Sequence, residues 1–183
     1  MATARTANTV PLRIVQNGGQ IISRVRTAGG DDDFYQCMLG RKDDAGKIHP
    51  LPADTTNTTV INALTEGAKG IHVVCVEDFD YSADGTAKYI AYQEIDRSTV
   101  LEVQTLGTAA PTVANIGDQV DLRWVLANRA TVADFPTTDS PNGCARIVDV
   151  EQNWNPRKDE SDGKNTLIRI SILPDLIVVD PVA

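Results

Sequence analysis

Several residue types that other classes of protein depend on are scarce in this chain of 183 residues. Glu and Lys number only six each, against 19 Asp and 11 Arg, although the exposed faces of helices are normally built from Glu and Lys. There are only two His, the commonest catalytic base, and aromatic residues make up 5% of the chain. This composition argues against a helical protein and against a histidine-based active site.

Cysteine, long apolar runs and positive charge are also sparse. Cys37, Cys75 and Cys144 are odd in number and far apart, which excludes a disulfide framework or zinc motif and indicates reduced thiols in a cytosol. No apolar run approaches the roughly 20 residues of a membrane helix, and residues 1–8 lack the apolar core of a signal peptide. A net charge of −8 disfavours nucleic acid, which needs a basic stripe. We expect a cytoplasmic protein that binds neither membrane nor nucleic acid.

The chain is instead rich in β-branched residues, with 18 Val, 14 Ile and 18 Thr, and these favour pleated strands. About ten short apolar or alternating segments are separated by turn dipeptides such as Asn17-Gly18 and Asp84-Gly85. The pattern predicts an all-β fold, an antiparallel β-sandwich or jelly-roll-like barrel with at most one short helix. Residues 1–10 are predicted to form a flexible or extended arm, and residues 11–183 a single domain.

Individual elements follow from turns and periodicity. Three hairpins are predicted, joining residues 12–16 to 20–26, residues 34–39 to 47–51, and residues 71–80 to 86–96. Further strands are predicted over residues 100–106, 119–127, 145–152, 166–173 and 176–182. The segment 119–127 alternates in polarity. The residues predicted to point inward are Val120, Leu122, Trp124 and Leu126, and those predicted to point outward are Asp121 and Arg123.

Two segments are predicted to form structures other than strands. Residues 57–69 are predicted to form one short helix, with Val60, Ile61 and Leu64 on a shared face. Residues 131–142 contain proline and are predicted to form a loop.

Neither histidine has a predicted catalytic partner. His49 precedes Pro50 at a strand end, and His72 lies inside a strand that is apolar on both faces. Because residues three apart on a strand point to opposite faces, His72 and Cys75 cannot share a metal ion. We interpret His72 as a buried, hydrogen-bonded residue beside a core cysteine.

One loop partly matches a calcium site. Asp80, Ser82 and Asp84 supply oxygens at positions 1, 3 and 5, and Gly85 stands at position 6. Position 12 is Ala91 instead of a bidentate Glu, and the flanks are predicted strands, so a plain hairpin turn is the alternative. No other metal site, no cofactor and no catalytic residue is predicted.

Both ends of the chain indicate contacts with other proteins. The arm is uncharged apart from Arg5, and the final segment is strongly apolar where chains usually fray. An apolar terminal strand must be covered by its own sheet or by a neighbouring subunit. A lone Trp in a polar loop is typical of an interface anchor. The predicted partner-binding residues are Val10, Leu12, Trp154, Leu176, Ile177 and Val178.

In its strand pattern, its Ala/Thr-rich residues 1–9 and its acidic balance, the chain resembles the small β-rich decoration, or cement, proteins of tailed bacteriophage capsids. The resemblance is spread over the whole chain. It implies a non-enzymatic virion protein that binds the major capsid protein, often as a homotrimer on local three-fold axes, and stabilises the expanded shell. A minor head or tail protein fits the same features.

Two other functions are compatible with the residues. A ligand-binding β-sandwich that recognises carbohydrate would use Trp154 and the amides of Asn153 and Asn155. A carboxylate-based hydrolase would draw on the abundant Asp, and loss of an activity on one Asp→Asn change would identify it. We expect the virion structural protein.

Overall fold

The computed structural model describes residues 12–17, 21–25, 33–42, 48–51, 58–61, 70–78, 89–105, 111–138, 142–150 and 167–177. Over these ranges the fold consists of twelve β-strands and three single-turn 3-10 helices. The strands form two antiparallel sheets, so the predicted all-β fold is confirmed. No helix in this part of the chain is long and apolar enough to cross a membrane.

The larger sheet has seven strands in the hydrogen-bonded order β1-β8-β12-β11-β9-β10, with β5 paired to β9. They are β1 (Arg13–Gln16), β5 (Thr59–Ile61), β8 (Val100–Gln104), β9 (Gln119–Val125), β10 (Ala130–Thr138), β11 (Ala145–Val150) and β12 (Leu167–Ile172). An isolated bridge between Thr105 and Ala133 brings β10 back toward β8. The sheet therefore curls, although its described strands do not close into a barrel.

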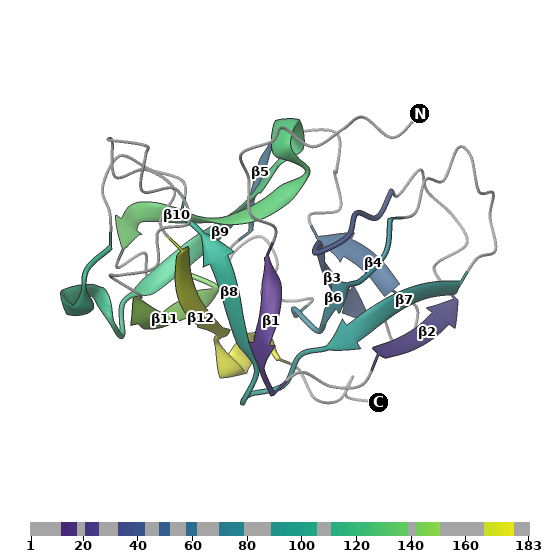
Figure 1. Ribbon diagram of the computed structural model, residues 1–183, viewed down its shortest axis with the longest axis horizontal. Helices are drawn as coiled ribbons and strands as arrows, with labels where there is room; N and C mark the ends of the chain where they lie inside the picture. Colours follow the sequence, from purple (N-terminus) through teal and green to yellow (C-terminus); the bar gives the residue numbers. More distant parts are fainter. Residues whose placement is uncertain are drawn as a thin grey trace.

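The smaller sheet has five strands in the order β2-β7-β6-β3-β4. They are β2 (Ile21–Val25), β3 (Leu39–Lys42), β4 (Ile48–Leu51), β6 (Val73–Cys75) and β7 (Tyr89–Glu94). The pairing of two predicted hairpins is confirmed here, because β3 pairs with β4 and β6 pairs with β7. The strand predicted over residues 34–39 is misplaced, since residues 35–38 form a turn and β3 begins only at Leu39. The two sheets lie side by side along the long axis of the molecule (Figure 1).

The first predicted hairpin, between residues 12–16 and 20–26, is wrong. β1 pairs with β8 in the larger sheet, whereas β2 pairs with β7 in the smaller one. Asn17 has the positive φ of a tight turn, 53°, but it turns the chain from one sheet toward the other. Its Nδ2 donates to the Ser98 carbonyl (3.2 Å), and Thr99 Oγ1 donates to the Asn17 carbonyl (2.9 Å). The β1–β2 and β7–β8 links are thus held together at a corner where both chain segments change sheet.

The predicted helix over residues 57–69 is wrong where the structure describes it. Residues 59–61 form strand β5, which pairs with β9 in the register Thr59↔Trp124 and Ile61↔Leu122. Three consecutive β-branched side chains favour this pairing over a helix. Residues 57 and 62–69 lie outside the described part of the chain.

The loop predicted over residues 131–142 is mostly strand β10. β10 ends the strand order of the larger sheet, and proline is tolerated on an edge strand because the missing N–H faces no partner. Its pairing with β9 is irregular between Ala133 and Thr138, around Pro136. The position of β10 in the sheet, which the sequence does not reveal, explains the error.

The strand predicted from residue 176 is also wrong at its start. The chain forms the 3-10 helix η3 (Pro174–Leu176), with Pro174 at its first position. Proline there is favourable because its fixed φ suits the turn and its missing N–H is not needed. Residues 178–183 lie outside the described part of the chain.

The alternation predicted for β9 is correct in its centre. Val120, Leu122 and Trp124 are fully buried. Leu126 is 36% exposed instead of buried, because the chain leaves the strand there and enters the 3-10 helix η2 (Leu126–Asn128). Asp121, predicted outward, is only 8% exposed.

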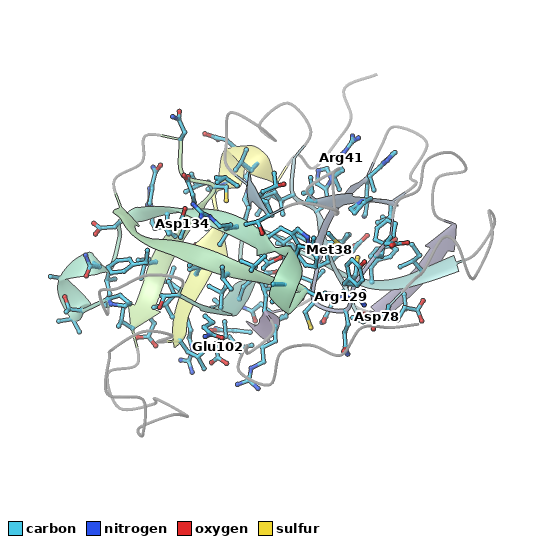
Figure 2. The ribbon with its side chains drawn as sticks, turned by 90° about the horizontal axis from the view of Figure 1, so that it is seen from above. Met38, Arg41, Asp78, Glu102, Arg129 and Asp134 are labelled. Atoms are coloured by element: carbon cyan, nitrogen blue, oxygen red, sulfur yellow. The ribbon has the colours of Figure 1, made fainter. Side chains whose placement is uncertain are left out.

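One buried cluster draws on both sheets. Its members from the larger sheet include Leu122, Trp124, Ile147 and Ile170, and those from the smaller sheet include Leu39, Val73 and Tyr92. The turn before β3 contributes an aromatic contact between the sheets, since the Tyr35 ring stacks on Trp124 with centroids 5.4 Å apart. The Arg129 guanidinium lies over the Tyr35 ring, with its Cζ 4.6 Å from the ring centroid. Figure 2 places Arg129 and Met38 where the two sheets meet.

Candidate functional site

Charged residues on four neighbouring strands of the larger sheet stand in one row. Glu102 of β8 is in register with both Arg13 of β1 and Arg169 of β12. Arg169 is in turn opposite Asp149 of β11. Residues directly opposite each other in an antiparallel pair share a face of the sheet. These four residues, called here the charge row, therefore alternate in sign across the sheet.

The two ion pairs of the charge row differ in the burial of the carboxylate, although the Arg13 side chain itself is 53% exposed. Arg13 Nε and Nη2 lie 2.7 and 2.6 Å from Glu102 Oε1, and the Glu102 side chain is only 5% exposed. Arg169 Nη1 lies 3.1 Å from Asp149 Oδ2, with side chains 37% and 44% exposed. A carboxylate held this far from water depends on its cation. The outer pair contributes under about 1 kcal/mol to stability, and its charges are accessible to a partner.

Three exposed apolar side chains lie on β11 and on the turn that contacts it. Val113 begins the 3-10 helix η1 (Val113–Asn115) and is 60% exposed, and Ile116, which follows η1, is 46% exposed. Val148 of β11 is 38% exposed. η1 contacts β11, and Figure 1 shows this short coil beside β11 at one end of the molecule. We call Val113, Ile116 and Val148 the apolar corner. Grouped apolar side chains on a surface are typical of an interaction site, whereas single ones are common anywhere.

Local hydrogen bonds give the apolar corner a defined shape. The Asn115 amide donates to the Thr112 carbonyl (2.9 Å), and the Thr112 amide donates to Asn115 Oδ1 (3.0 Å). Asn115 Nδ2 also donates to Asp118 Oδ2 (3.0 Å). Gly117 follows with φ 101°, a conformation that favours glycine, and its amide donates to the Ile147 carbonyl of β11 (2.8 Å). These hydrogen bonds hold the turn together and against β11, and they leave its apolar side chains exposed to solvent.

The apolar corner and the charge row meet on β11. The register of β11 with β12 is irregular between Ile147 and Asp149, so Val148 is the extra residue of a bulge. A bulge redirects side chains locally, and here the exposed Val148 stands directly before Asp149. We call the apolar corner together with Asp149 and Arg169 the docking face. It combines an apolar centre with a charged rim.

Three predicted partner-binding residues lie in the core of the chain itself. Leu12 is 0% exposed, Leu176 is 4% exposed and Ile177 is 5% exposed. The Leu176 carbonyl accepts the Ile71 amide at 2.8 Å. The apolar C-terminal segment was expected to be covered either by the chain's own fold or by a neighbouring subunit. As far as Ile177, the chain's own fold covers it. The other predicted partner-binding residues lie outside the described ranges: Val10, Trp154 and Val178.

The candidate calcium ligands Asp80, Ser82 and Asp84 also lie outside the described ranges. Within those ranges, no group of three or more His, Cys, Asp or Glu side chains is placed to hold a metal ion.

Both histidines lie beside β3. His49 of β4 is in register with Arg41, and His72 Nδ1 accepts the Lys42 amide at 2.8 Å. The hydrogen bond predicted for His72 is therefore present, although the residue is half-buried and not fully buried. Its ring nitrogen accepts the hydrogen bond of a backbone amide at the end of β3, in place of a backbone carbonyl. This is a structural role.

The docking face was not identified from the sequence. The pattern Thr112-x-x-Asn115 before Gly117-Asp118 does indicate a closed turn that carries Val113. Nothing in the local sequence indicates that β11, which carries Val148 far along the chain, contacts this turn, because that contact depends on the strand order.

The fold and this face define an all-β protein of two antiparallel sheets with a candidate interaction surface on the larger one. No protein-family model matches the chain, and no curated protein or solved structure is significantly similar to it.

Proposed function

We propose that this chain is a non-enzymatic structural protein of a virion and that it binds a bacteriophage capsid, through the docking face, as a decoration or cement protein. The observation that carries the proposal is that the exposed Val113, Ile116 and Val148 lie on β11 and on the turn that contacts it, and that β11 also carries Asp149 of the accessible pair Arg169–Asp149. Protein interfaces typically combine an apolar centre with a polar, solvent-accessible rim.

The docking face suits binding because it is already formed. Val148, Asp149 and Arg169 are carried by two paired strands, and Val113 and Ile116 by a hydrogen-bonded turn. Ordering loops and side chains costs free energy on association, and a preformed surface avoids much of that cost. A preformed face is also what a protein that stabilises a rigid shell requires.

The choice of a capsid as the partner comes from the sequence resemblance. In that interpretation the docking face contacts the major capsid protein, while the arm, residues 1–10, supports a homotrimer at a local three-fold axis. The alternating charges of the rim would fix the orientation of the complex more than its strength, because exposed charges mainly contribute specificity and association rate.

A pull-down from the native source, with the purified chain as bait, tests the proposal. Wild type is expected to recover the major capsid protein and to sediment as a homo-oligomer. Ile116→Asp combined with Val148→Asp is expected to reduce that recovery at least tenfold, because each change places a charge in the apolar centre of the contact.

Leu126→Asp is the matched control. Leu126 is 36% exposed but lies at the far end of β9 from η1, about 20 Å away for a strand of this length. This variant should retain capsid binding. A monomeric chain that recovers no capsid protein would contradict the proposal. Specific binding on a glycan array that is lost in Trp154→Ala would instead support the carbohydrate-binding function.

A further inference from the structure

Two cysteines that are far apart in the sequence are neighbours in the smaller sheet. The Cys37 amide donates to the Cys75 carbonyl at 2.7 Å, and the Cys75 amide donates to the Met38 carbonyl at 2.8 Å. Cys37 and Met38 thus both stand opposite Cys75, as the two residues of a bulge stand opposite one. Cα atoms in a regular hydrogen-bonded pair are about 5.5 Å apart, within the range that a disulfide spans, and the hydrogen bond from Cys37 to Cys75 holds the two backbones together in a comparable way.

Cys37 has a backbone conformation that residues other than glycine and asparagine rarely adopt. The Met38 amide donates to the Tyr35 carbonyl (2.9 Å), so Cys37 is the third residue of a tight turn, and its φ is 69°. Glycine or asparagine is usual at such a position. Residues kept in strained conformations are found preferentially at functional positions, and here the strained residue carries a thiol.

The surroundings of the two thiols differ in a way that sets their chemistry. Cys37 is half-buried and reachable from solvent, whereas Cys75 is buried. Burial raises the pKa of the Cys75 thiol far above its ordinary value, and the charges of the neighbouring Cys37 and Glu77 raise it further. Cys144 is separate: it is buried next to the larger sheet, and its Sγ donates to the Ile61 carbonyl at 3.1 Å.

We propose that Cys37 and Cys75 form a reversible disulfide when the protein meets a small oxidised disulfide of the glutathione type. The Cys37 thiolate attacks one sulfur of that disulfide, which forms a mixed disulfide and releases one small thiol. The Cys75 sulfur then attacks Cys37, loses its proton to solvent and releases the second small thiol. The two cysteines are oxidised by two electrons, and one small disulfide is reduced to two thiols.

The second step is the slow one. Only the thiolate is nucleophilic, and burial raises the pKa of the Cys75 thiol, which favours its protonated form. The mixed disulfide on Cys37 should therefore accumulate at neutral pH and convert faster as the pH rises, by about tenfold per pH unit while Cys75 remains mostly protonated.

Closing this disulfide would act on the junction between the sheets. The turn that holds Cys37 also carries Tyr35, which stacks on Trp124 of β9. A covalent link from this turn to β6 would tether the smaller sheet to the aromatic contact that joins it to the larger one. This role is independent of capsid binding.

The test is oxidation of the full chain with oxidised glutathione at several pH values, followed by alkylation, intact-mass measurement and peptide mapping without reductant. The expected product lacks two hydrogen atoms and contains linked peptides of Cys37 and Cys75, with Cys144 alkylated. Cys144→Ser should give the same product. Cys75→Ala should stop at glutathione on Cys37, and circular dichroism establishes that this variant is folded.

Four outcomes would overturn the proposal: a wild-type chain in which glutathione remains on Cys37 at every pH, a disulfide that includes Cys144, a Cys37–Cys37 link between two chains, or no reaction. Cys37→Ala changes a half-buried turn position, and circular dichroism is used to establish that this second variant is folded. It must abolish the linked peptide for the assignment to hold.

Discussion

Among the described residues, three that are not glycine have positive φ: Asn17 at 53°, Cys37 at 69° and Arg129 at 46°. Each lies where the chain changes direction and is held by a contact from elsewhere. Asn17 bonds to the β7–β8 link, Cys37 to Cys75, and the Arg129 guanidinium packs over the Tyr35 ring. The left-handed conformation costs a residue with a side chain about 1–2 kcal/mol, which these contacts offset.

A comparison of Cys37→Gly with Cys37→Ala measures this cost directly. Both changes remove the thiol, but only glycine adopts φ near 69° without strain. The Gly variant is expected to be more stable than the Ala variant by about 1 kcal/mol, as measured by urea unfolding under reducing conditions. Gln36, which does not have positive φ, is the control position: there Ala should be at least as stable as Gly. Equal stability of the two Cys37 variants would contradict this account.

At the scale of elements, the β7–β8 link depends on one carboxylate. The Ser98 amide and hydroxyl both lie 2.7 Å from Asp96 Oδ1, and Thr99 Oγ1 lies 3.1 Å from it. The hydrogen bonds from Ser98, and then those from Thr99, lower the pKa of Asp96 below its ordinary value. Since Thr99 also bonds to Asn17, this carboxylate helps to hold the corner between the sheets.

The lowered pKa of Asp96 predicts a pH-dependent contribution to stability. The folded state binds a proton at Asp96 less readily than the unfolded chain, so the contribution is complete above the unfolded pKa of about 3.9. It declines as the pH falls through the folded-state pKa. Asp96→Asn should therefore be less stable than wild type at pH 7, with a smaller difference at pH 3, as measured by urea unfolding. A difference that does not change with pH would show that the charge of Asp96 is unimportant.

The charge row predicts that its two ion pairs differ in strength. A double-mutant cycle with Arg169→Met and Asp149→Asn should give a coupling of about 0.2–1 kcal/mol, as exposed pairs do. The cycle with Arg13→Met and Glu102→Gln should give a larger coupling. Arg13→Met should also cost more than Glu102→Gln, because it leaves a buried carboxylate without that cation. Equal couplings would mean that the burial of Glu102 has no energetic consequence.

At the scale of the whole molecule, the two sheets share one hydrophobic cluster. Neither sheet is therefore expected to remain folded when the other unfolds. Ile170→Val in the larger sheet and Val73→Ala in the smaller one should each shift the same thermal transition. The first is expected to cost about 0.5–1.5 kcal/mol. Scanning calorimetry provides the measurement, and two resolved transitions that respond separately to the two variants would contradict a shared core.

The arrangement of the molecule also determines which of its surfaces are available to partners. Leu12, Leu176 and Ile177 are used in the core, whereas Val113, Ile116 and Val148 are exposed at the end of the larger sheet. All six are apolar, so composition alone does not separate the two groups. Their different roles depend on where each residue lies relative to the paired strands.

Local sequence was enough for the class of fold and for some of its parts. Abundant Val, Ile and Thr with frequent turn dipeptides predicted antiparallel strands, and the adjacent pairs β3–β4 and β6–β7 followed from the turn signals between them. The alternation of Val120, Leu122 and Trp124 predicted their burial. These features depend on neighbours along the chain, and a strand's side chains alternate whatever its partner is.

Tertiary structure alone decided the rest. The separation of β1 from β2 into different sheets, the strand at Pro136 and the pairing of β5 with β9 all follow from partners distant in the sequence. The same holds for the docking face, where η1 contacts β11, and for the approach of Cys37 to Cys75. Backbone pairing between distant strands is set by the combined burial and hydrogen bonding of the whole chain, and no local pattern records it.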